Sequence, residues 1–356
     1  MVSVRDNMHV FVAGGAGYIG SVLVPSLLEH GHRVTVLDRL FFGNSLAASE
    51  ARFADRLRVV RADIRSFDPE LLSSVDAVVD LAGISNDPSC ALEPDLTRGV
   101  NLGGTKRLAA AARELGVRRY VYSSSCSVYG HGQATGLSET SERHPVSLYA
   151  RVKADAEDFL FEVGQRCHGE MRVCALRLAT VFGLSPRMRF DLAINVMTKN
   201  AYMSHRIMVD GGGRQWRPFV HVRDAAAAFE RVLGAEDSAV GGQVFNVGSD
   251  QNNVQILNLA FRVRDAVPGT EVVHAPTDPD LRDYHVSFEK VHRVLGFRAE
   301  RSIDDGIGEV LAALRDGTVD PEDRRWYTLK QYLFLREAER AWTELALGGH
   351  LLTPAS

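Results

Sequence analysis

The sequence is organised around residues 8–20, Met8-His-Val-Phe-Val-Ala-Gly-Gly-Ala-Gly-Tyr-Ile-Gly20. The apolar run at its start predicts a short buried strand, and Ser21-Val-Leu-Val-Pro-Ser-Leu-Leu28 predicts a helix beyond a glycine turn. Strand, glycine turn and helix form the context of a dinucleotide-binding fingerprint, which is matched by Gly14-x-x-Gly17-x-x-Gly20 and by Gly15-x-Gly17-x-x-Gly20. Glycine is needed here because a side chain would block the tight turn and the approach of the backbone to a pyrophosphate.

A second apolar strand, Val34-Thr-Val-Leu-Asp38, ends in an acidic residue. A carboxylate at this point accepts hydrogen bonds from an adenosine ribose and repels a 2′-phosphate, which favours NAD over NADP. Arg39 favours NADP instead, because a guanidinium group there could bind the 2′-phosphate. We give more weight to Asp38, which holds the deciding position, and predict NAD as the cofactor.

Length and composition are those of an ordinary globular protein, with 356 residues, 45% hydrophobic and 24% charged residues and a formal net charge of −4. The sequence contains no long run of like charges, so nothing in it indicates a nucleic acid or a membrane as the main partner. The sequence lacks a signal-peptide pattern and a membrane-spanning apolar stretch, so we expect a cytoplasmic protein. The cysteines, at positions 90, 126, 167 and 174, fit no zinc spacing, so we expect free thiols and no metal site.

Strand and helix patterns alternate through the first half of the chain. Apolar runs at 57–63, 76–83, 118–125 and 172–177 predict further strands, with helices over 95–115 and 147–165. Repeated β–α units predict an α/β fold with a doubly wound parallel sheet. We expect a Rossmann-type NAD-binding domain over 1–183, to which 219–248 returns. Residues 184–218 and 249–345 would form a smaller mixed substrate domain, and the final helix over 325–345 would be exposed or pack in an oligomer.

Tyr149-Ala-Arg-Val-Lys153 carries the strongest indication of chemistry. On a helix, residues four apart share a face, so the Lys153 ammonium lies beside the Tyr149 phenol. A free tyrosine has a pKa of about 10 and is a poor base at neutral pH, but a nearby cation lowers that pKa. Ser123-Ser-Ser125 ends a predicted strand, where ligands bind in open α/β sheets. Such a set can remove a proton from a sugar hydroxyl while hydride leaves the same carbon.

Together these motifs resemble the extended short-chain dehydrogenase/reductase superfamily, specifically its NAD-dependent nucleotide-sugar epimerases and dehydratases. The likeness runs from about Val10 to about Phe297 and rests on Gly14, Gly17, Gly20, Asp38, Asp63, Ile64, Leu81, Ala82, Gly83, Asn101, Ser123 to Gly130, Tyr149, Lys153, Leu176, Arg177 and Arg217 to Val222. The resemblance implies a nucleoside-diphosphate sugar as substrate. It also implies a homodimer built through helices near 99–115 and 147–166.

The resemblance also implies roles for individual residues. Tyr149 is similar to the family's base, Lys153 to its partner and Ser125 to the active-site hydroxyl. The residues expected to bind the cofactor are Gly14, Gly17, Tyr18, Ile19, Gly20, Asp38, Arg39, Asp63, Ile64, Leu81, Ala82, Gly83, Tyr149 and Lys153. Those expected to border the substrate are Ser85, Asn86, Ser125, Thr180, Asn195, Arg217 and Arg282, the two arginines for its diphosphate.

One departure from the family bears on the reaction. Sugar 4,6-dehydratases place an Asp-Glu pair directly after the active-site hydroxyl, and this chain has Cys126 and Ser127 there. Neither residue suits acid–base elimination of water at neutral pH. We therefore expect an epimerase that passes through a transient keto-sugar at C4. An oxidoreductase, decarboxylase or dehydratase of the same superfamily is the alternative, and a non-catalytic NAD-binding sensor is a further one.

Overall fold

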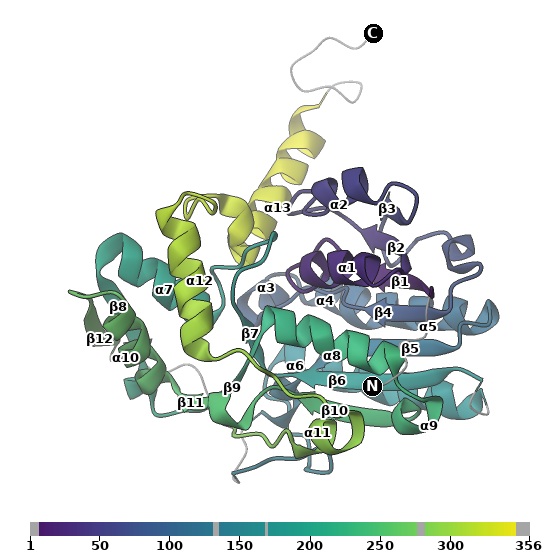
Figure 1. The fold of residues 1–356 in the computed structure, drawn as a ribbon. Coiled ribbons are helices and arrows are strands. Elements are labelled where there is room, and N and C mark those ends of the chain that lie inside the picture. Colours follow the sequence, from purple (N-terminus) through teal and green to yellow (C-terminus); the bar gives the residue numbers. More distant parts are fainter. Residues whose placement is uncertain (1–6, 131–134, 168–169, 276–281, 347–356) are drawn as a thin grey trace.

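The computed structural model describes residues 7–130, 135–167, 170–275 and 282–346. At its centre lies a seven-stranded sheet of order β10-β6-β5-β4-β1-β2-β3 (Figure 1), in which neighbouring strands are parallel. The strands are β1 (His9–Ala13), β2 (Arg33–Asp38), β3 (Leu57–Arg61), β4 (Ala77–Asp80), β5 (Arg119–Ser125), β6 (Arg172–Leu178) and β10 (Gln243–Val247). The strand order reverses between β1 and β4, which opens a crevice for a ligand at their carboxyl ends. The doubly wound Rossmann-type sheet predicted from the sequence is confirmed.

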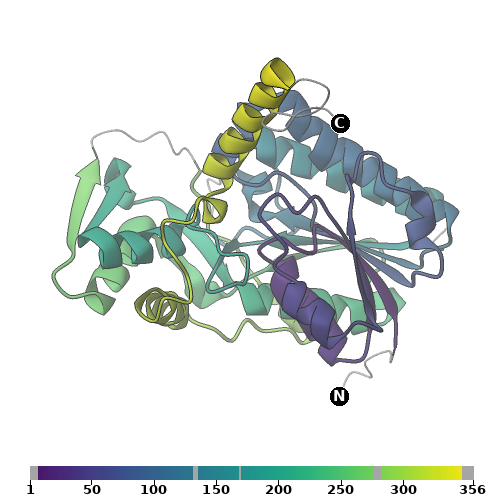
Figure 2. The ribbon, with the colours of Figure 1, turned by 90° about the horizontal axis from the view of Figure 1, so that it is seen from above.

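Helices cover both faces of this sheet, as the view from above shows (Figure 2). One face carries α1 (Gly20–Glu29) and α8 (Val222–Gly234), and the other carries α5 (Thr105–Glu114) and α6 (Leu148–Arg166). Alternate residues of β1 therefore enter different cores: Val10 and Val12 pack with α1 and α8, whereas Phe11 packs with α5 and α6. Burial on both faces explains why these strands read as nearly continuous apolar runs.

The connection from β4 to β5 is more broken than the helix predicted over 95–115. It contains α3 (Asp87–Leu92), α4 (Pro94–Arg98), a π-helical turn (Gly99–Gly104) and then α5. Gly104 permits this path, because a Cβ atom there would clash with the Ile64 side chain. Shorter helices elsewhere are α2 (Ala47–Arg52), α9 (Asp237–Val240) and α11 (Glu289–Leu295).

The second half of the chain adds two small sheets and a core of its own. A three-stranded sheet has the order β11-β9-β7, and a separate parallel pair joins β12 to β8. Their strands are β7 (Thr180–Phe182), β8 (Arg206–Asp210), β9 (Trp216–His221), β11 (Asn253–Gln255) and β12 (Glu271–Ala275). They pack with α7 (Ala193–Ser204), α10 (Ile256–Ala266) and α12 (Ile303–Arg315). Of the segment 219–248, β10 joins the central sheet, whereas β9 pairs with β7 and β11.

The last helix is α13 (Thr328–Leu345), which the sequence predicted to be exposed or to pack in an oligomer. Thr328 and Gln331 in its first turns are buried against the rest of the chain, whereas most of its other residues are exposed, among them Phe334 at 40% and Trp342 at 50%. In both views α13 rises from the junction of the two halves (Figures 1 and 2). Among the residues that the structure describes, no helix combines the length and hydrophobicity needed to cross a membrane.

Candidate active site

The glycine turn between β1 and α1 forms one wall of a cavity of about 1700 Å³. Gly14 has a φ of +76°, and a Cβ atom there would lie 2.8 Å from the backbone of Ala82, so a larger residue would be both strained and blocked. Gly20 begins α1 where a Cβ would collide with the backbone of Gly15. Gly14, Gly17, Tyr18, Ile19 and Gly20 all line the cavity. The free N–H groups at the start of α1 suit a pyrophosphate at this wall.

Asp38 stands at the rim of the same cavity. Its carboxylate accepts hydrogen bonds from the backbone N–H groups of Ala16, at 3.1 Å, and Leu40, at 2.8 Å, which fix its orientation. Arg39 donates to Asp63 at 3.1 Å instead of extending alone toward a 2′-phosphate. This pairing removes the ambiguity that Arg39 introduced and agrees with a ribose-binding carboxylate at Asp38.

The part of the cavity that the resemblance assigns to adenine is formed by charge pairs around Asp63 and by the residues that follow β4. The side-chain hydrogen bonds of Arg65 are the main cause that lowers the pKa of Asp63 to about 2, so this carboxylate stays charged. Ile64, Leu81, Ala82 and Gly83 line the cavity beside it. Asn101 fastens the loop after Gly83 by bonding both N–H (2.7 Å) and C=O (2.9 Å) of Ile84. A glycine-lined backbone wall facing a fixed carboxylate fits a dinucleotide.

Ser125, Tyr149 and Lys153 meet at the carboxyl end of β5, as the sequence predicted they would. Ser125 is the last residue of β5, and its hydroxyl interacts with the Tyr149 phenol in the sense that lowers the pKa of that phenol. Lys153, one helical turn further along α6, is 5% exposed, and its Nζ donates to the carbonyl oxygen of Ser123 at 2.6 Å. That Nζ lies 5.9 Å from the centre of the Tyr149 ring. All three side chains line the cavity.

The electrostatics of Tyr149 differ from the sequence expectation. Burial is the main influence on its hydroxyl and raises its pKa above the ordinary value. A cation that acts against this rise is Arg189, from the second half of the chain, which the sequence did not indicate. Burial also lowers the pKa of Lys153, which the nearby carboxylate of Asp80 partly offsets. The phenol is therefore protonated in this structure and needs further positive charge to become a base.

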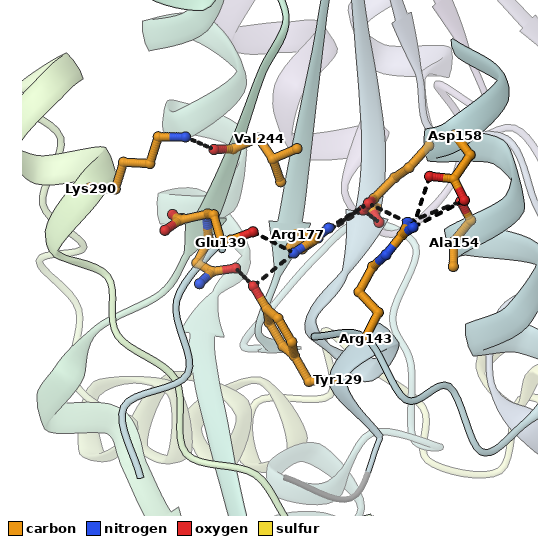
Figure 3. Close-up of polar contacts among 11 residues, drawn as sticks. Tyr129, Glu139, Arg143, Ala154, Asp158, Arg177, Val244 and Lys290 are labelled. Atoms are coloured by element: carbon orange, nitrogen blue, oxygen red, sulfur yellow. Dashed lines mark hydrogen bonds and ion pairs between the residues drawn. The ribbon is translucent and has the colours of Figure 1, made fainter. Parts of the chain in front are cut away.

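A buried ion-pair network behind the serines holds β5, β6 and α6 together (Figure 3). Arg177 of β6 donates to both carboxylate oxygens of Glu157 on α6, at 3.0 and 2.7 Å, and to the Tyr129 hydroxyl at 2.9 Å. Ser124, next to the active-site serine, donates to the same carboxylate. Arg143 contacts Glu157 at 3.3 Å from the outer side. This network fixes α6, and thus Tyr149 and Lys153, against the end of β5.

The second half of the chain contributes two arginines to the cavity. Arg217 of β9 lies with its guanidinium carbon 5.2 Å from the centre of the Tyr284 ring and donates to the Trp216 carbonyl at 2.7 Å. Arg282 donates to Asp87 at the start of α3, at 2.8 Å. The structure therefore brings both predicted diphosphate arginines into the cavity that contains the glycine turn.

The loop before α3 reaches across to the segment after β7. Ser85 and Asn86 line the cavity, and Asn86 caps α3 by accepting from the Ser89 backbone at 2.9 Å. Its amide nitrogen donates to Asp191, which in turn is bound by Arg189 at 2.8 Å. This pairing places the charged Arg189–Asp191 couple beside the loop that the resemblance assigns to the sugar.

Thr180 and Asn195 have different positions. Thr180, at the start of β7, lines the cavity. Asn195 is fully buried and is absent from the cavity lining. Its side chain donates to the Tyr18 hydroxyl at 3.1 Å and accepts from the Gly183 backbone at 3.0 Å. Asn195 thus braces Tyr18 from behind, and the structure does not bring it to the substrate side as expected.

Sequence reasoning missed a third group of cavity residues, which no local pattern marks. Arg187 lies with its guanidinium carbon 3.8 Å from the centre of the Phe42 ring and donates to Thr328 of α13 at 3.2 Å. Burial, reinforced by the charge of Arg189, lowers the pKa of Arg187 to about 9. Tyr332 of α13 also lines the cavity. These residues meet only because α13 folds back over the site.

A Rossmann-type sheet with a dinucleotide-binding turn and a Ser–Tyr–Lys set beside it defines an extended short-chain dehydrogenase/reductase. Within that class, the sequence model of the NAD dependent epimerase/dehydratase family matches residues 10–248, and the chain belongs to this family. Its cofactor is accordingly NAD.

Relatives of this chain are named for different reactions. It is 32% identical over 321 residues to a UDP-glucose 4-epimerase of Mycolicibacterium smegmatis, with 87% of this chain and 99% of that protein covered. It is 30% identical over 334 residues to a dTDP-glucose 4,6-dehydratase of Streptomyces niveus, with 90% and 95% covered. The solved structure of MoeE5 in complex with UDP-glucuronic acid and NAD matches with a TM-score of 0.76 and 27% identity, over 87% of this chain and 99% of that one.

Proposed function

We propose that this protein is an NAD-dependent nucleotide-sugar epimerase that inverts a sugar carbon, C4, through a transient keto-sugar. The observation that carries the proposal is the pairing of Ser125 with Tyr149 at the carboxyl end of β5, where both residues line one cavity. This pair lines one cavity with the glycine turn and with Arg217. A proton acceptor, a cofactor wall and a phosphate-binding cation thus share a single space.

Each residue has a defined task in such a reaction. Tyr149 takes the proton from the sugar hydroxyl, while Ser125 hydrogen-bonds the same oxygen and the phenol. When bound, NAD supplies the acceptor for the hydride that leaves that carbon, the donor when hydride returns to the other ring face, and a positive charge beside the phenol. The keto-sugar rotates within the site between the two hydride transfers, so that its other face meets the cofactor. Tyr149 then returns its proton to the new hydroxyl. The net reaction consumes no cofactor.

The protonation of Tyr149 depends on the positive charges around it. Because burial raises the pKa of this phenol, its base form is rare until positive charge offsets that effect. The Lys153 ammonium, held by the Ser123 carbonyl, supplies one charge near the ring. We infer that Lys153 lowers the pKa of Tyr149 enough for catalysis only together with the positive charge of the bound cofactor. Activity should then rise with pH as Tyr149 loses its proton.

The residues after Ser125 favour an epimerase over a 4,6-dehydratase. Cys126 is 1% exposed, its thiol donates to the Arg177 carbonyl at 3.2 Å, and burial raises the pKa of that thiol. It therefore faces the interior of the sheet and can neither protonate a leaving hydroxyl nor remove a proton from the sugar. Ser127 reaches the cavity lining but is no acid or base at neutral pH.

Substrate and assembly follow from the same reasoning. We propose a nucleoside-diphosphate sugar as substrate, with its diphosphate bound by Arg217 and Arg282. A guanidinium group suits this task because it can donate two parallel hydrogen bonds to phosphate oxygens. MoeE5, a solved relative, binds UDP-glucuronic acid and NAD. We also propose a cytoplasmic homodimer that pairs through α5 and α6, which light scattering and charge-reversing substitutions on those helices would test.

A panel of nucleotide sugars tests the reaction type. NAD-loaded protein is incubated with UDP- and dTDP-hexoses, and products are identified by NMR while the absorbance of reduced nicotinamide is followed. We expect two epimers at equilibrium and no stoichiometric change in absorbance. Net reduction of NAD would identify an oxidoreductase, release of carbon dioxide a decarboxylase, and loss of water a dehydratase. No turnover with any sugar would indicate an NAD-binding sensor, and each of these four results contradicts the proposal.

A further inference from the structure

The C-terminal helix α13 lines the cavity on the side of the loop that follows Asp38, where we expect the adenosine of the cofactor. Gln331 donates from Nε2 to the Phe41 carbonyl oxygen at 2.7 Å, which ties α13 to the loop that follows Asp38. The Tyr332 ring packs edge-on against the rings of Phe41 and Phe42, with centroid distances of 6.1 and 5.6 Å. Residues from the helix therefore complete the wall that begins with the ribose-binding carboxylate.

Two more anchors hold α13 in this place. On one side Thr328 accepts from Arg187 at 3.2 Å, in the segment that runs past the substrate side of the cavity. On the other side Arg336 pairs with Glu93, between α3 and α4, at 3.4 Å. The helix thus contacts both the second half of the chain and the first, and Figure 2 shows it beside the junction of the two halves. The α13 residues in the cavity lining are Thr328, Leu329, Tyr332, Leu335, Arg336 and Glu339.

Tyr332 occupies a position suited to a hydrogen-bond donor toward the ribose. Burial raises the pKa of its hydroxyl to about 12, and the charges of Arg187 and Asp38 also act on it. The phenol is therefore protonated at neutral pH, and it lines the same cavity as Asp38, the carboxylate expected to bind the ribose. The family match ends at residue 248, so the family likeness itself assigns nothing to α13.

We propose that α13 is a strap that completes the NAD-binding site, with Tyr332 as a cofactor-contacting residue, and that NAD leaves only when the strap lifts. A dinucleotide enclosed between the glycine turn and α13 is shielded from solvent along its adenosine half. Release then requires breaking the anchors at Thr328, Gln331 and Arg336 in addition to the cofactor's own contacts. Retained cofactor suits an enzyme that returns its hydride in every cycle.

The rate of NAD release tests the strap directly. Protein loaded with NAD is diluted into excess isotopically labelled NAD, and the bound nucleotide is followed by mass spectrometry. We expect Tyr332→Ala to release NAD about tenfold faster than the unaltered protein, the loss expected for a buried aromatic contact. Trp342→Ala is the matched control, because this aromatic residue of the same helix is 50% exposed and lies outside the cavity lining. An unchanged rate in Tyr332→Ala would overturn the proposal.

Hydrogen exchange of the unaltered protein provides a test that does not depend on a variant. We expect bound NAD to slow amide exchange over 328–336, while exchange over 340–345 stays the same. Faster exchange over 328–336 would mean that NAD displaces the helix, and unchanged exchange would mean that the helix does not sense the cofactor. Either result would contradict a strap.

Discussion

The cofactor side and the sugar side of the cavity are built in different ways. Apart from α13, the cofactor side comes from residues adjacent in sequence, such as the turn over 14–20, and from strand ends that the fold aligns. On the sugar side, contacts join residues far apart: Asn86 and Asp191 are 105 positions apart, and Asp87 and Arg282 are 195 apart. We therefore expect the dinucleotide to be recognised by backbone geometry that local sequence dictates, and the sugar by side-chain pairs that only the complete fold assembles.

This difference explains why relatives that share the cofactor differ in reaction. A glycine turn leaves few alternatives, because larger residues are excluded by φ and by close contacts such as that between Gly14 and Ala82. The Arg189–Asp191 couple lies in the segment after β7, outside the central sheet. We therefore expect substitutions on the two sides to affect separate measurements, and the predictions below rely on that separation.

The largest effect is expected where the two sides meet. Tyr149→Phe keeps the ring but removes the proton acceptor, so turnover should fall by about a thousandfold, within the range for general-base catalysis. The content of bound NAD should not change, which the nucleotide released on denaturation would show. Tyr202→Phe, on α7 and outside the cavity lining, is the control. Near-normal turnover in Tyr149→Phe would remove Tyr149 from the role of base.

The network behind the serines should contribute stability to the platform that both sides share. Glu157→Gln leaves Arg177 buried without its charged partner, and we expect it to lower the free energy of unfolding by about 3 kcal/mol. Asp158→Asn is matched to it, because Asp158 neighbours Glu157 in sequence, also pairs with Arg143 and is 64% exposed. Its effect should be below about 0.5 kcal/mol. Equal unfolding midpoints in urea for the two variants would refute a structural role for the buried pair.

Lys153→Met tests the charge near Tyr149. Removing a cation raises the pKa of a neighbouring phenol, so less base is present at a given pH. We expect turnover at neutral pH to fall by about a hundredfold, and the rising limb of the pH–rate profile to move to higher pH. Because burial already raises the pKa of Tyr149, the unaltered protein should also gain activity as pH increases. A limb that stays in place would show that Lys153 acts only by position.

Arg217→Ala addresses the sugar side alone. Loss of a charge-assisted hydrogen bond to the diphosphate should raise KM for the nucleotide sugar about thirtyfold. NAD content should be unaffected, because the cofactor wall is formed by other segments. Arg214→Ala, an exposed arginine three positions earlier and outside the cavity lining, should leave KM unchanged. A loss of NAD in Arg217→Ala would break the separation between the sides.

Asp38→Ala addresses the cofactor side alone, with the smallest expected effect. Without the ribose-binding carboxylate, NAD affinity should drop about tenfold and discrimination against NADP should weaken. KM for the sugar should stay the same when NAD is saturating. Asp55→Ala, whose side chain is 81% exposed, is the control in titrations of both nucleotides. An unchanged preference for NAD would assign discrimination to other residues, such as Arg39 and Asp63.

What the sequence could predict follows the same division. The glycine turn, the parallel sheet and the meeting of Ser125 with Tyr149 and Lys153 are all predictable, because each depends on spacing along one helix or on strand ends. The prediction that Asn195 borders the substrate is wrong, because its side-chain amide forms hydrogen bonds with Tyr18 and Gly183 instead. Tyr18 is far from it in the chain, and Gly183 lies across a loop. Spacing alone does not show which polar side chains the core consumes.

The C-terminal helix and the charge at the phenol were beyond sequence reasoning for a related cause. An amphipathic pattern over 325–345 predicts that one face of the helix is covered, but it does not show which residues cover it. Phe41 and Phe42, which pack against that face, lie near the other end of the chain. The pKa of Tyr149 depends on how deeply the ring is buried and on Arg189, which approaches from the second half. Both depend on tertiary packing, which leaves no local pattern.

The fate of a labelled hydrogen tests the central claim most directly. A nucleotide sugar carrying deuterium at C4 is incubated with the NAD-loaded protein in ordinary water, and the epimers are analysed by NMR and mass spectrometry. If hydride leaves and returns to the same carbon, both epimers keep deuterium at C4, and neither gains hydrogen there from solvent. Epimers that lose the label to water, or a product that carries it at another carbon, would contradict a transient C4 oxidation by this protein.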